Sequence, residues 1–291
     1  MFERVLVGVD GRQGGRDAIA LARRLADPGA TLTLANVCER MYVPARTGPG
    51  ENREAAERML AAEAPSSEAG AELVVVESTS PARGLHELAE DSDTDLLVLG
   101  SCHRGALGRA TLGDDTRAGV NGAPCAVAVA PHGYAAVTRP LASIGVAYNG
   151  TPESERALAA ARELAARTSA RITALRIVTP PSYLYTGILP PAGVGTDELV
   201  DAAEAQMDAL EGIETEARYG AIDPDLEQFS KEVDLLALGS RGYGPAMRLI
   251  EGSTSRYLLR HSRAPLLVLP RGARSPTPDS PEAAAASSRH P

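Results

Sequence analysis

The sequence predicts an α/β fold made of two tandem doubly wound sheets, each with five parallel strands separated by helices. Short apolar runs alternate with segments of helical period along the chain, as in a parallel sheet that helices cover on both faces. The pattern also occurs twice, because residues 95–101 (DLLVLGS) match residues 234–240 (DLLALGS) at a shift of 139. The same shift relates Gly11 to Gly150 and Gly113 to Gly252, so we interpret the chain as a repeat.

The elements of the first copy follow the order strand, helix, strand. An apolar strand at residues 5–9 precedes a helix whose apolar face carries Ala18, Leu21, Ala22 and Leu25. Further strands are predicted at residues 32–37, 73–76, 96–99 and 126–129, and helices around residues 53–63 and 83–90. The second copy repeats this order from a strand at residues 144–148 to a strand at residues 266–269. In such sheets ligands bind beyond the carboxyl ends of the strands, at the switch point.

The two copies are separated by a stretch with Gly, Pro and Thr between Pro131 and Pro140. We therefore expect a first domain over residues 1–132 and a second over residues 141–271. Residues 272–291 are rich in Pro, Ser and Ala, and we expect this tail to be disordered.

Composition excludes several classes of function. The 291 residues are 44% hydrophobic and 23% charged, which is typical of a folded protein, and the net charge is −9. That charge argues against nucleic acid and anionic membranes as partners. No apolar run approaches the roughly 18 residues that span a bilayer, and no signal peptide opens the chain, so we expect a cytoplasmic protein. The three cysteines and five histidines lack the spacing of a disulfide framework or metal site.

The second copy carries the residue types of an anion site after its fourth strand. Glycines let backbone N–H groups approach an oxyanion, hydroxyl groups add donors, and a helix start adds partial positive charge. The residues concerned are Gly239, Arg241, Gly242, Gly252, Ser253 and Thr254. Taken singly, the glycines could only turn the chain and Ser253 could only cap a helix. Together, on this fold, they favour phosphate.

After the fourth strand, Gly-x-x-Gly is followed nine residues later by Gly-Ser, and Val-x-Val-Asp accompanies the first strand. These motifs resemble the universal stress protein family. The resemblance occurs twice and covers nearly the whole chain. The resemblance implies flavodoxin-like sheets of strand order 3-2-1-4-5, a pseudo-two-fold pairing through the fifth strands, and ATP with Mg²⁺ held by its phosphates. It implies that the phosphates bind Gly239, Gly242, Gly252, Ser253 and Thr254, and that adenine and ribose bind Ala147, Asn149 and Ile177. In the first copy it indicates a weaker set: Val9, Asp10, Val37, Gly100 and Gly113.

The copies depart from the family pattern in different places. In the first, His103 replaces the second glycine, and Asp114 and Asp115 replace the Ser-Thr pair. A carboxylate 4 Å from a phosphate oxygen costs about 1 kcal/mol at water's dielectric constant and about 4 kcal/mol at an effective constant near 20. In the second copy Asn149 stands where the family has Asp, which keeps an acceptor and loses a charge. We therefore predict that the first copy is mainly structural and that the second binds the nucleotide.

Little in the sequence indicates catalysis. The lysine of a P-loop is missing, because the only lysine, Lys231, precedes a strand, and no Gly-x-Ser-x-Gly elbow occurs. We expect an ATP-binding sensor or regulator linked to stress, organised as an internal pseudo-dimer that could pair again as a homodimer. Two alternatives stay open. One is a slow ATPase in which Asn149 or Arg241 positions water and charge, and the other is an interaction module that binds a small metabolite.

Overall fold

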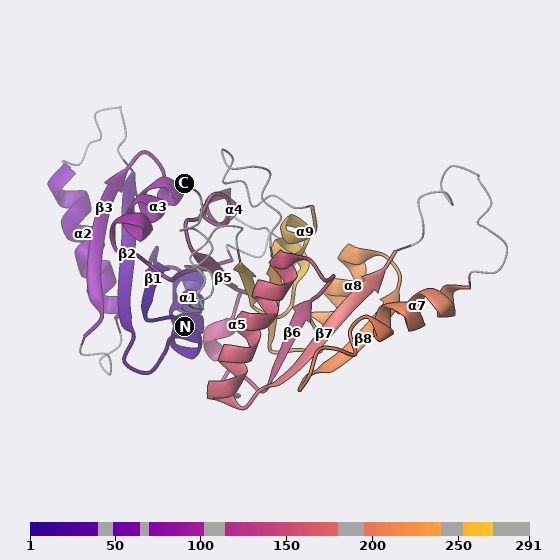
Figure 1. Cartoon of the computed structure of the whole chain (residues 1–291). Helices are drawn as coiled ribbons and strands as arrows, with labels where there is room; N and C mark the ends of the chain where they lie inside the picture. The colour runs from indigo at the N-terminus through magenta and orange to yellow at the C-terminus, as the bar shows by residue number, and fades with distance from the viewer. Residues whose placement is uncertain (40–48, 65–69, 102–113, 180–194, 240–252, 270–291) are drawn as a thin grey trace, which may run out of the picture.

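Ten strands in the described part of the chain form one continuous sheet (Figure 1). The computed structural model describes residues 1–39, 49–64, 70–101, 114–179, 195–239 and 253–269. The predicted tail at residues 272–291 lies outside these residues. The strand order is β3-β2-β1-β4-β5-β10-β9-β6-β7-β8, so the first half of the chain builds one end of the sheet and the second half builds the other.

The strand order within each half is the predicted 3-2-1-4-5. The first five strands are β1 Arg4–Gly8, β2 Thr31–Glu39, β3 Glu72–Ser78, β4 Leu96–Gly100 and β5 Ala126–Ala130. The second five are β6 Ser143–Ala147, β7 Arg171–Val178, β8 Glu214–Tyr219, β9 Leu235–Gly239 and β10 Leu266–Leu269. The pairs within each half are parallel, and β1 and β6 each lie between the second and fourth strand of their half. This confirms the predicted fold class.

Helices cover both faces of the sheet. Their bounds are α1 Gln13–Leu25, α2 Pro49–Glu63, α3 Pro81–Asp91, α4 Asp114–Val120, α5 Pro152–Thr168, α7 Thr196–Ala205, α8 Ile222–Phe229 and α9 Ser253–His261. Helices α1, α2, α5 and α7 contribute to one buried apolar cluster, and α3, α4, α8 and α9 contribute to another. Strand side chains alternate between them, since Val5 and Val7 belong to the first cluster and Leu6 to the second.

The two halves join through their fifth strands, as the resemblance implied. β5 and β10 pair antiparallel, with Leu267 opposite Ala128. All residues of both strands are buried, so the joint is part of the core. Because the joint is antiparallel, the strands of the two halves end at opposite edges of the sheet. Any site beyond the carboxyl ends therefore opens at a different edge in each copy.

The connection between the copies is fastened to α1. A short 3₁₀ helix, η1 (Tyr134–Ala136), packs against α1, and its first turn is held by the fully buried Asp17. The Asp17 carboxylate accepts hydrogen bonds from the backbone N–H groups of Gly133 and Ala135, each at 2.8 Å. A buried carboxylate needs such donors to offset the loss of its hydration. The predicted linker is thus an ordered part of the fold.

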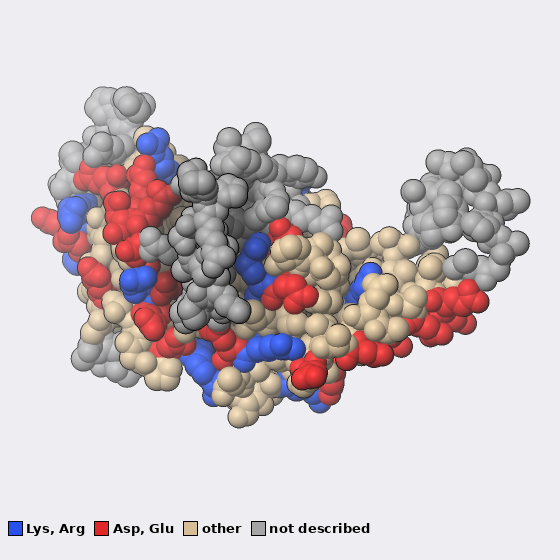
Figure 2. All heavy atoms as spheres, in the orientation of Figure 1, with Lys and Arg blue, Asp and Glu red and all other residues tan. Residues whose placement is uncertain are grey.

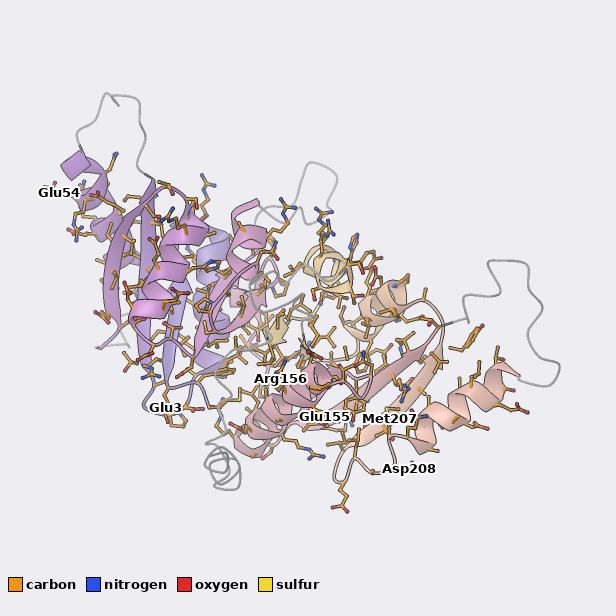
Figure 3. The ribbon with its side chains drawn as sticks, turned by 45° about the horizontal axis from the view of Figure 1, so that its top comes forward. Glu3, Glu54, Glu155, Arg156, Met207 and Asp208 are labelled. Atoms are coloured by element: carbon orange, nitrogen blue, oxygen red, sulfur yellow. The ribbon has the colours of Figure 1, made fainter. Side chains whose placement is uncertain are left out.

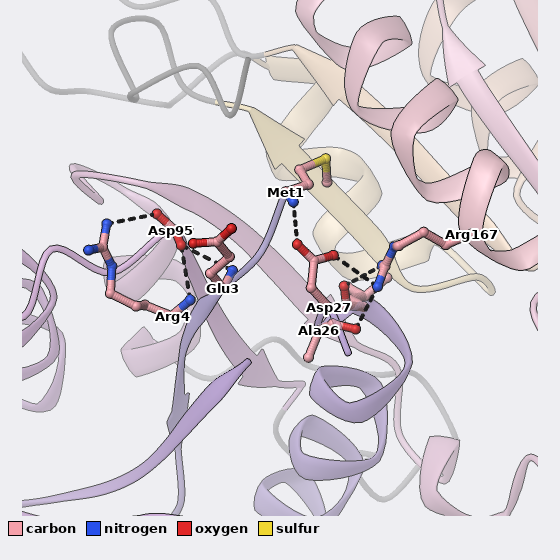
Figure 4. A network of polar contacts seen from close by, with 8 residues as sticks. Met1, Glu3, Arg4, Ala26, Asp27, Asp95 and Arg167 are labelled. Atoms are coloured by element: carbon pink, nitrogen blue, oxygen red, sulfur yellow. Dashed lines mark hydrogen bonds and ion pairs between the residues drawn. The ribbon is translucent and has the colours of Figure 1, made fainter. Parts of the chain in front are cut away.

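A second polar contact ties the copies together at the end of α1 (Figure 4). Arg167, in the last turn of α5, donates 2.7 Å hydrogen bonds to the carbonyl oxygens of Leu25 and Ala26 and forms a 2.9 Å ion pair with Asp27. The amino group of Met1 also pairs with Asp27. A cation at a helix C-terminus is favourable, because it meets carbonyl groups that lack partners within the helix.

Charge is unevenly distributed over the surface (Figure 2). Acidic side chains follow one another along α7, the outer helix of the second half, at Asp197, Glu198, Asp201 and Glu204. None of the described helices combines the length and apolar character that crossing a bilayer requires. Among the described residues, no three His, Cys, Asp or Glu side chains gather where they could hold a metal ion.

Candidate functional site

A cavity of about 130 Å³ lies toward the carboxyl ends of β1, β2 and β4 in the first copy. β1 pairs with both other strands, so this is the switch point of the first sheet. Four residues predicted for this copy line the cavity: Val9, Asp10, Val37 and Gly100. Gly113 and His103 lie outside the described residues. The fold therefore brings together every described member of the first-copy set.

Local hydrogen bonds shape the turn between β1 and α1. Oδ1 of Asp10 accepts a 3.0 Å hydrogen bond from the backbone N–H of Arg12, and Gly11 between them has a φ of +73°, which glycine adopts without strain. Asn36 donates a 2.7 Å hydrogen bond to the carbonyl oxygen of Val9. The Asp10 side chain is still 46% exposed. The Asp10 carboxylate can therefore stabilise the turn and still contact a ligand.

The glycines at the ends of β4 and β9 let a helix approach the strand end closely. A Cβ atom on Gly100 would lie 2.0 Å from the carbonyl oxygen of Gly14, in the first turn of α1. In the second copy, a Cβ atom on Gly239 would lie 2.3 Å from the carbonyl oxygen of Glu153, in the first turn of α5. Both glycines are therefore needed for packing, whatever they bind. Their packing sets the N-terminus of a helix beside the end of the fourth strand in each copy.

In the second copy, the predicted nucleoside residues lie at one edge of the sheet. Ala147 ends β6, and Ile177 lies on β7 two residues beyond Leu175, the pairing partner of Ala147. Both half-buried side chains pack against the same apolar cluster. Gly239 ends β9, the other neighbour of β6. These residues surround the switch point of the second sheet.

The remaining second-copy residues lie around the turn before α5, at the start of α9, or outside the described part of the chain. Asn149 uses its Oδ1 atom to accept a 2.7 Å hydrogen bond from the Thr151 hydroxyl group. Ser253 and Thr254 open α9, with Ser253 exposed and Thr254 half-buried. Arg241, Gly242 and Gly252 lie outside the described residues, as do the side chains of Asp114 and Asp115 in the first copy.

Acidic side chains mark the first turn of α5, as Figure 3 shows for Glu155 beside Arg156. Glu153 is buried, and its carboxylate lies 3.9 Å from the Arg156 guanidinium group. Glu155 accepts a hydrogen bond from the Tyr148 hydroxyl group. Burial, together with this bond, raises the pKa of Tyr148 to about 12. The carboxylates also interact favourably with the positive end of the helix dipole.

The sequence did not point to three polar residues near the switch points of the two sheets. Asn36 and Thr116 line the first cavity, and the Thr116 hydroxyl donates a 2.9 Å hydrogen bond to the Gly100 carbonyl oxygen. Glu153 occupies the position of Gly14 at the shift of 139. The repeat register could have revealed Glu153, because it places an acid where the first copy has glycine. Asn36 and Thr116 had no comparable signal, since both lie in otherwise ordinary element sequences.

The comparisons with known proteins agree with the repeat. The family model described as "Universal stress protein family" matches twice, at residues 1–131 and 141–270. A universal stress protein of Mycobacterium tuberculosis (strain ATCC 25618 / H37Rv) is 27% identical over 206 residues, which cover 66% of this chain and 69% of that protein. A second one from the same strain is 29% identical over 187 residues, 61% of this chain and 62% of that protein.

Solved structures share the fold. The crystal structure of a universal stress protein from Archaeoglobus fulgidus DSM 4304 superposes with a TM-score of 0.68 at 19% identity, covering 94% of this chain and all of that one (100%). A protein of unknown function from Pseudomonas aeruginosa PAO1 gives a TM-score of 0.64 at 17% identity, covering 93% of both chains. At these identities the likeness concerns the fold.

Proposed function

The chain belongs to the universal stress protein family, and from this premise we propose that it binds ATP at the carboxyl ends of its strands and acts as a stress-linked, nucleotide-dependent sensor or regulator. We further propose that the second copy is the principal site and that the protein works in the cytoplasm. The proposal concerns binding, and it assigns no catalytic residue.

The observation that carries this proposal is the close approach of a helix N-terminus to the end of the fourth strand. In the second copy the contact between Gly239 and Glu153 sets the first turn of α5 at the strand end. A helix N-terminus carries partial positive charge, which suits phosphate oxygens. In α5 part of this charge is offset by Glu153 and Glu155, and Thr151 caps the Ser154 N–H group, whereas the first turn of α9 has no acidic residue. The Ser253 and Thr254 hydroxyl groups at the start of α9 supply further donors.

The described residues fit the nucleoside part of ATP. Ala147 and Ile177 are apolar side chains next to each other at the sheet edge, suitable for a flat base. Asn149 offers an amide group: its Oδ1 atom accepts hydrogen bonds from Thr151 in the turn, and its Nδ2 atom is a donor suited to a nucleoside oxygen. Mg²⁺ would be bound mainly by the phosphates, as is usual for this ion with nucleotides. When bound, it would neutralise phosphate charge.

The first copy supports a weaker role. Its cavity of about 130 Å³ is smaller than the roughly 300 Å³ at which ligand pockets for drug-sized molecules begin. Asp114 and Asp115 open α4 there, at the positions that Ser253 and Thr254 occupy in the second copy. Two carboxylates at these positions would oppose a polyphosphate. We therefore propose a structural role for the first copy, with the second binding the nucleotide.

The experiment that tests this proposal exchanges the residues at equivalent positions of the two copies, Ser and Thr in one and Asp in the other. Equilibrium dialysis of the full chain with ATP and Mg²⁺ should give one nucleotide per chain. Ser253→Asp should weaken binding by about fivefold to several hundredfold, depending on the effective dielectric constant. The reciprocal double variant Asp114→Ser with Asp115→Thr should add a second ATP. It is the matched control, because it alters the same positions in the other copy.

Each outcome has a distinct meaning. Two ATP molecules per wild-type chain would refute the difference between copies and leave nucleotide binding intact. No ATP at millimolar concentration would refute nucleotide binding and favour an interaction module for a small metabolite. Release of phosphate above background, abolished by Ser253→Asp, would establish slow ATP hydrolysis as an additional activity.

A further inference from the structure

A larger cavity lies where the two copies meet. It has a volume of about 320 Å³, and we call it the junction cavity. Its walls come from the end of β5 and the linker of the first copy, and from the C-terminal end of α9 and the start of β10 in the second copy. Because β5 and β10 are antiparallel, the end of one strand lies beside the start of the other. The junction cavity is therefore separate from the switch point of either sheet.

The walls of the junction cavity are strongly cationic. Among the described residues they include five Lys or Arg side chains and one carboxylate, that of Asp234. The five cations come from four separate parts of the chain: Arg24, Arg139, Lys231, Arg260 and Arg263. This excess stands out in a chain whose net charge is −9. Such a concentration of one charge sign in a concave site attracts ligands of the opposite sign.

The Asp234 carboxylate already has partners within the protein. Asp234 forms a 2.9 Å ion pair with Arg139 and accepts 3.0 Å hydrogen bonds from the backbone N–H groups of Ala142 and Ser143. These contacts hold the pKa of Asp234 below its ordinary value, against the opposing effect of burial. Asp234 therefore remains charged but offsets Arg139, and the other four cations keep their charge available.

The other cations have neutral partners or none among the described residues. Arg24 donates a 3.2 Å hydrogen bond to the Tyr134 hydroxyl group and lies 5.0 Å from the centre of that ring. Lys231 donates a 3.0 Å hydrogen bond to the side-chain oxygen of Gln228. Within the described part of the chain, no carboxylate forms an ion pair with Arg24, Lys231, Arg260 or Arg263. Arg24 is thus fixed in place, and the exposed Lys231, Arg260 and Arg263 can turn toward a ligand.

A buried hydroxyl group adds a second, independent observation. Ser101 lines the junction cavity and is only 5% exposed, yet its Oγ atom has no hydrogen-bond partner among the residues that the structure describes. A buried hydroxyl group without a partner loses its hydration without compensation, so such groups are rare in folded proteins. Because the Oγ atom is itself buried, the Ser101 side chain would have to turn toward the cavity before a ligand oxygen or a water molecule could satisfy it.

The inner surface of the cavity is apolar. Val129, Leu258 and Leu266 line it and are almost fully buried. The combination of an apolar floor with cationic side chains fits a small organic molecule that carries phosphate, because each part of such a molecule finds a matching surface. We propose that the junction cavity is a second ligand site, which binds a small phosphorylated metabolite and touches both copies at once.

Titration calorimetry on the full chain tests this site with defined probes. Phenyl phosphate and inorganic phosphate are compared in a Ser253→Asp background, which removes the phosphate donor proposed for the ATP site. Phenyl phosphate should bind more tightly, since its ring buries apolar surface that phosphate lacks. Equal affinity for the two probes, or no heat from either at millimolar concentration, would overturn the proposal.

The decisive variant removes two cations of the junction cavity. Lys231→Gln with Arg263→Gln should weaken phenyl phosphate binding by about tenfold or more, because two charge-assisted contacts are lost. The matched control, Arg83→Gln with Arg171→Gln, removes the same charge from exposed side chains elsewhere and should change affinity less than about twofold. All four side chains are exposed, so the melting temperature without ligand should shift by no more than about 2 °C.

The outcomes separate this site from the ATP site. Loss of affinity in the junction variant alone supports the proposal, whether or not the protein binds ATP. Equal losses in the junction and control variants would show that only overall charge matters and would overturn it. Unchanged binding in the junction variant would overturn it as well, because the probe would then lie elsewhere.

Discussion

Removing the buried carboxylate of Asp17 should loosen the connection between the two copies. Asp17 accepts hydrogen bonds from the backbone N–H groups of Gly133 and Ala135 at 2.8 Å and from Gln13 Nε2 at 3.0 Å. Each backbone donor left without a partner costs about 1–3 kcal/mol. Relief of the buried charge and entry of water recover part of this cost. We expect Asp17→Ala to lower the free energy of unfolding by about 2–4 kcal/mol, and Asp17→Asn, which keeps one acceptor oxygen, by about half as much.

Urea unfolding of the full chain, followed by circular dichroism, measures this change. The control is Asp201→Ala, which removes an exposed aspartate from α7 and should stay within about 0.5 kcal/mol of the wild type. Limited proteolysis should also cut Asp17→Ala faster within the linker. A free energy of unfolding for Asp17→Ala within about 0.5 kcal/mol of the wild type would refute the reasoning, because the linker would then be held by other contacts.

Three further outcomes are expected. Gly239→Ala should destabilise the chain by about 1–3 kcal/mol, since its Cβ atom would lie 2.3 Å from the Glu153 carbonyl oxygen. Gly195→Ala, whose Cβ atom would meet no described residue within 4 Å, should cost less than about 1 kcal/mol, as the change of an α7 N-cap residue. The urea midpoints of the two variants measure the difference. Burial raises the pKa of Cys125 to about 12, so a thiol reagent at pH 8 should modify it only after unfolding, and fast labelling of the native chain at this position would contradict that. The pKa of Tyr148 is raised from 10.0 to about 12, so its contribution to stability is complete below pH 10 and is lost toward pH 12. The stability difference between wild type and Tyr148→Phe should shrink over that range.

Sequence patterns predicted most of the fold because the strands are buried on both faces. A strand such as β4, Leu96–Gly100, is then a continuous apolar run that can be recognised without an alignment. The strand order within each half followed from the family resemblance. The repeat register further predicted that equivalent glycines, Gly100 and Gly239, would occupy equivalent places, and both do end the fourth strand of their half.

The missed features depend on residues that are distant in the sequence. Asp17 is an ordinary helix residue until the fold brings Gly133, 116 residues away, within 2.8 Å. The cations of the junction cavity lie on separate segments, so no local run of charged residues indicates them in the sequence. Lys231 precedes a strand and therefore could not cradle phosphates in a P-loop, yet it lines this cavity. Pattern reasoning finds local motifs, and it has no access to a site that forms only when the copies meet.

The antiparallel joint also has a consequence for synthesis on the ribosome. β5, with the sequence AVAVA, is buried along its whole length, and among the described strands β10 is the one that pairs with its outer edge. The paired residues Ala128 and Leu267 are 139 residues apart, which a ribosome translates in about 7–30 s at 5–20 residues per second. During this interval the β5 edge is an apolar template that a neighbouring nascent chain can pair with. The first copy therefore has an unpaired β5 edge, open to strand exchange with another chain, until its own β10 has been made.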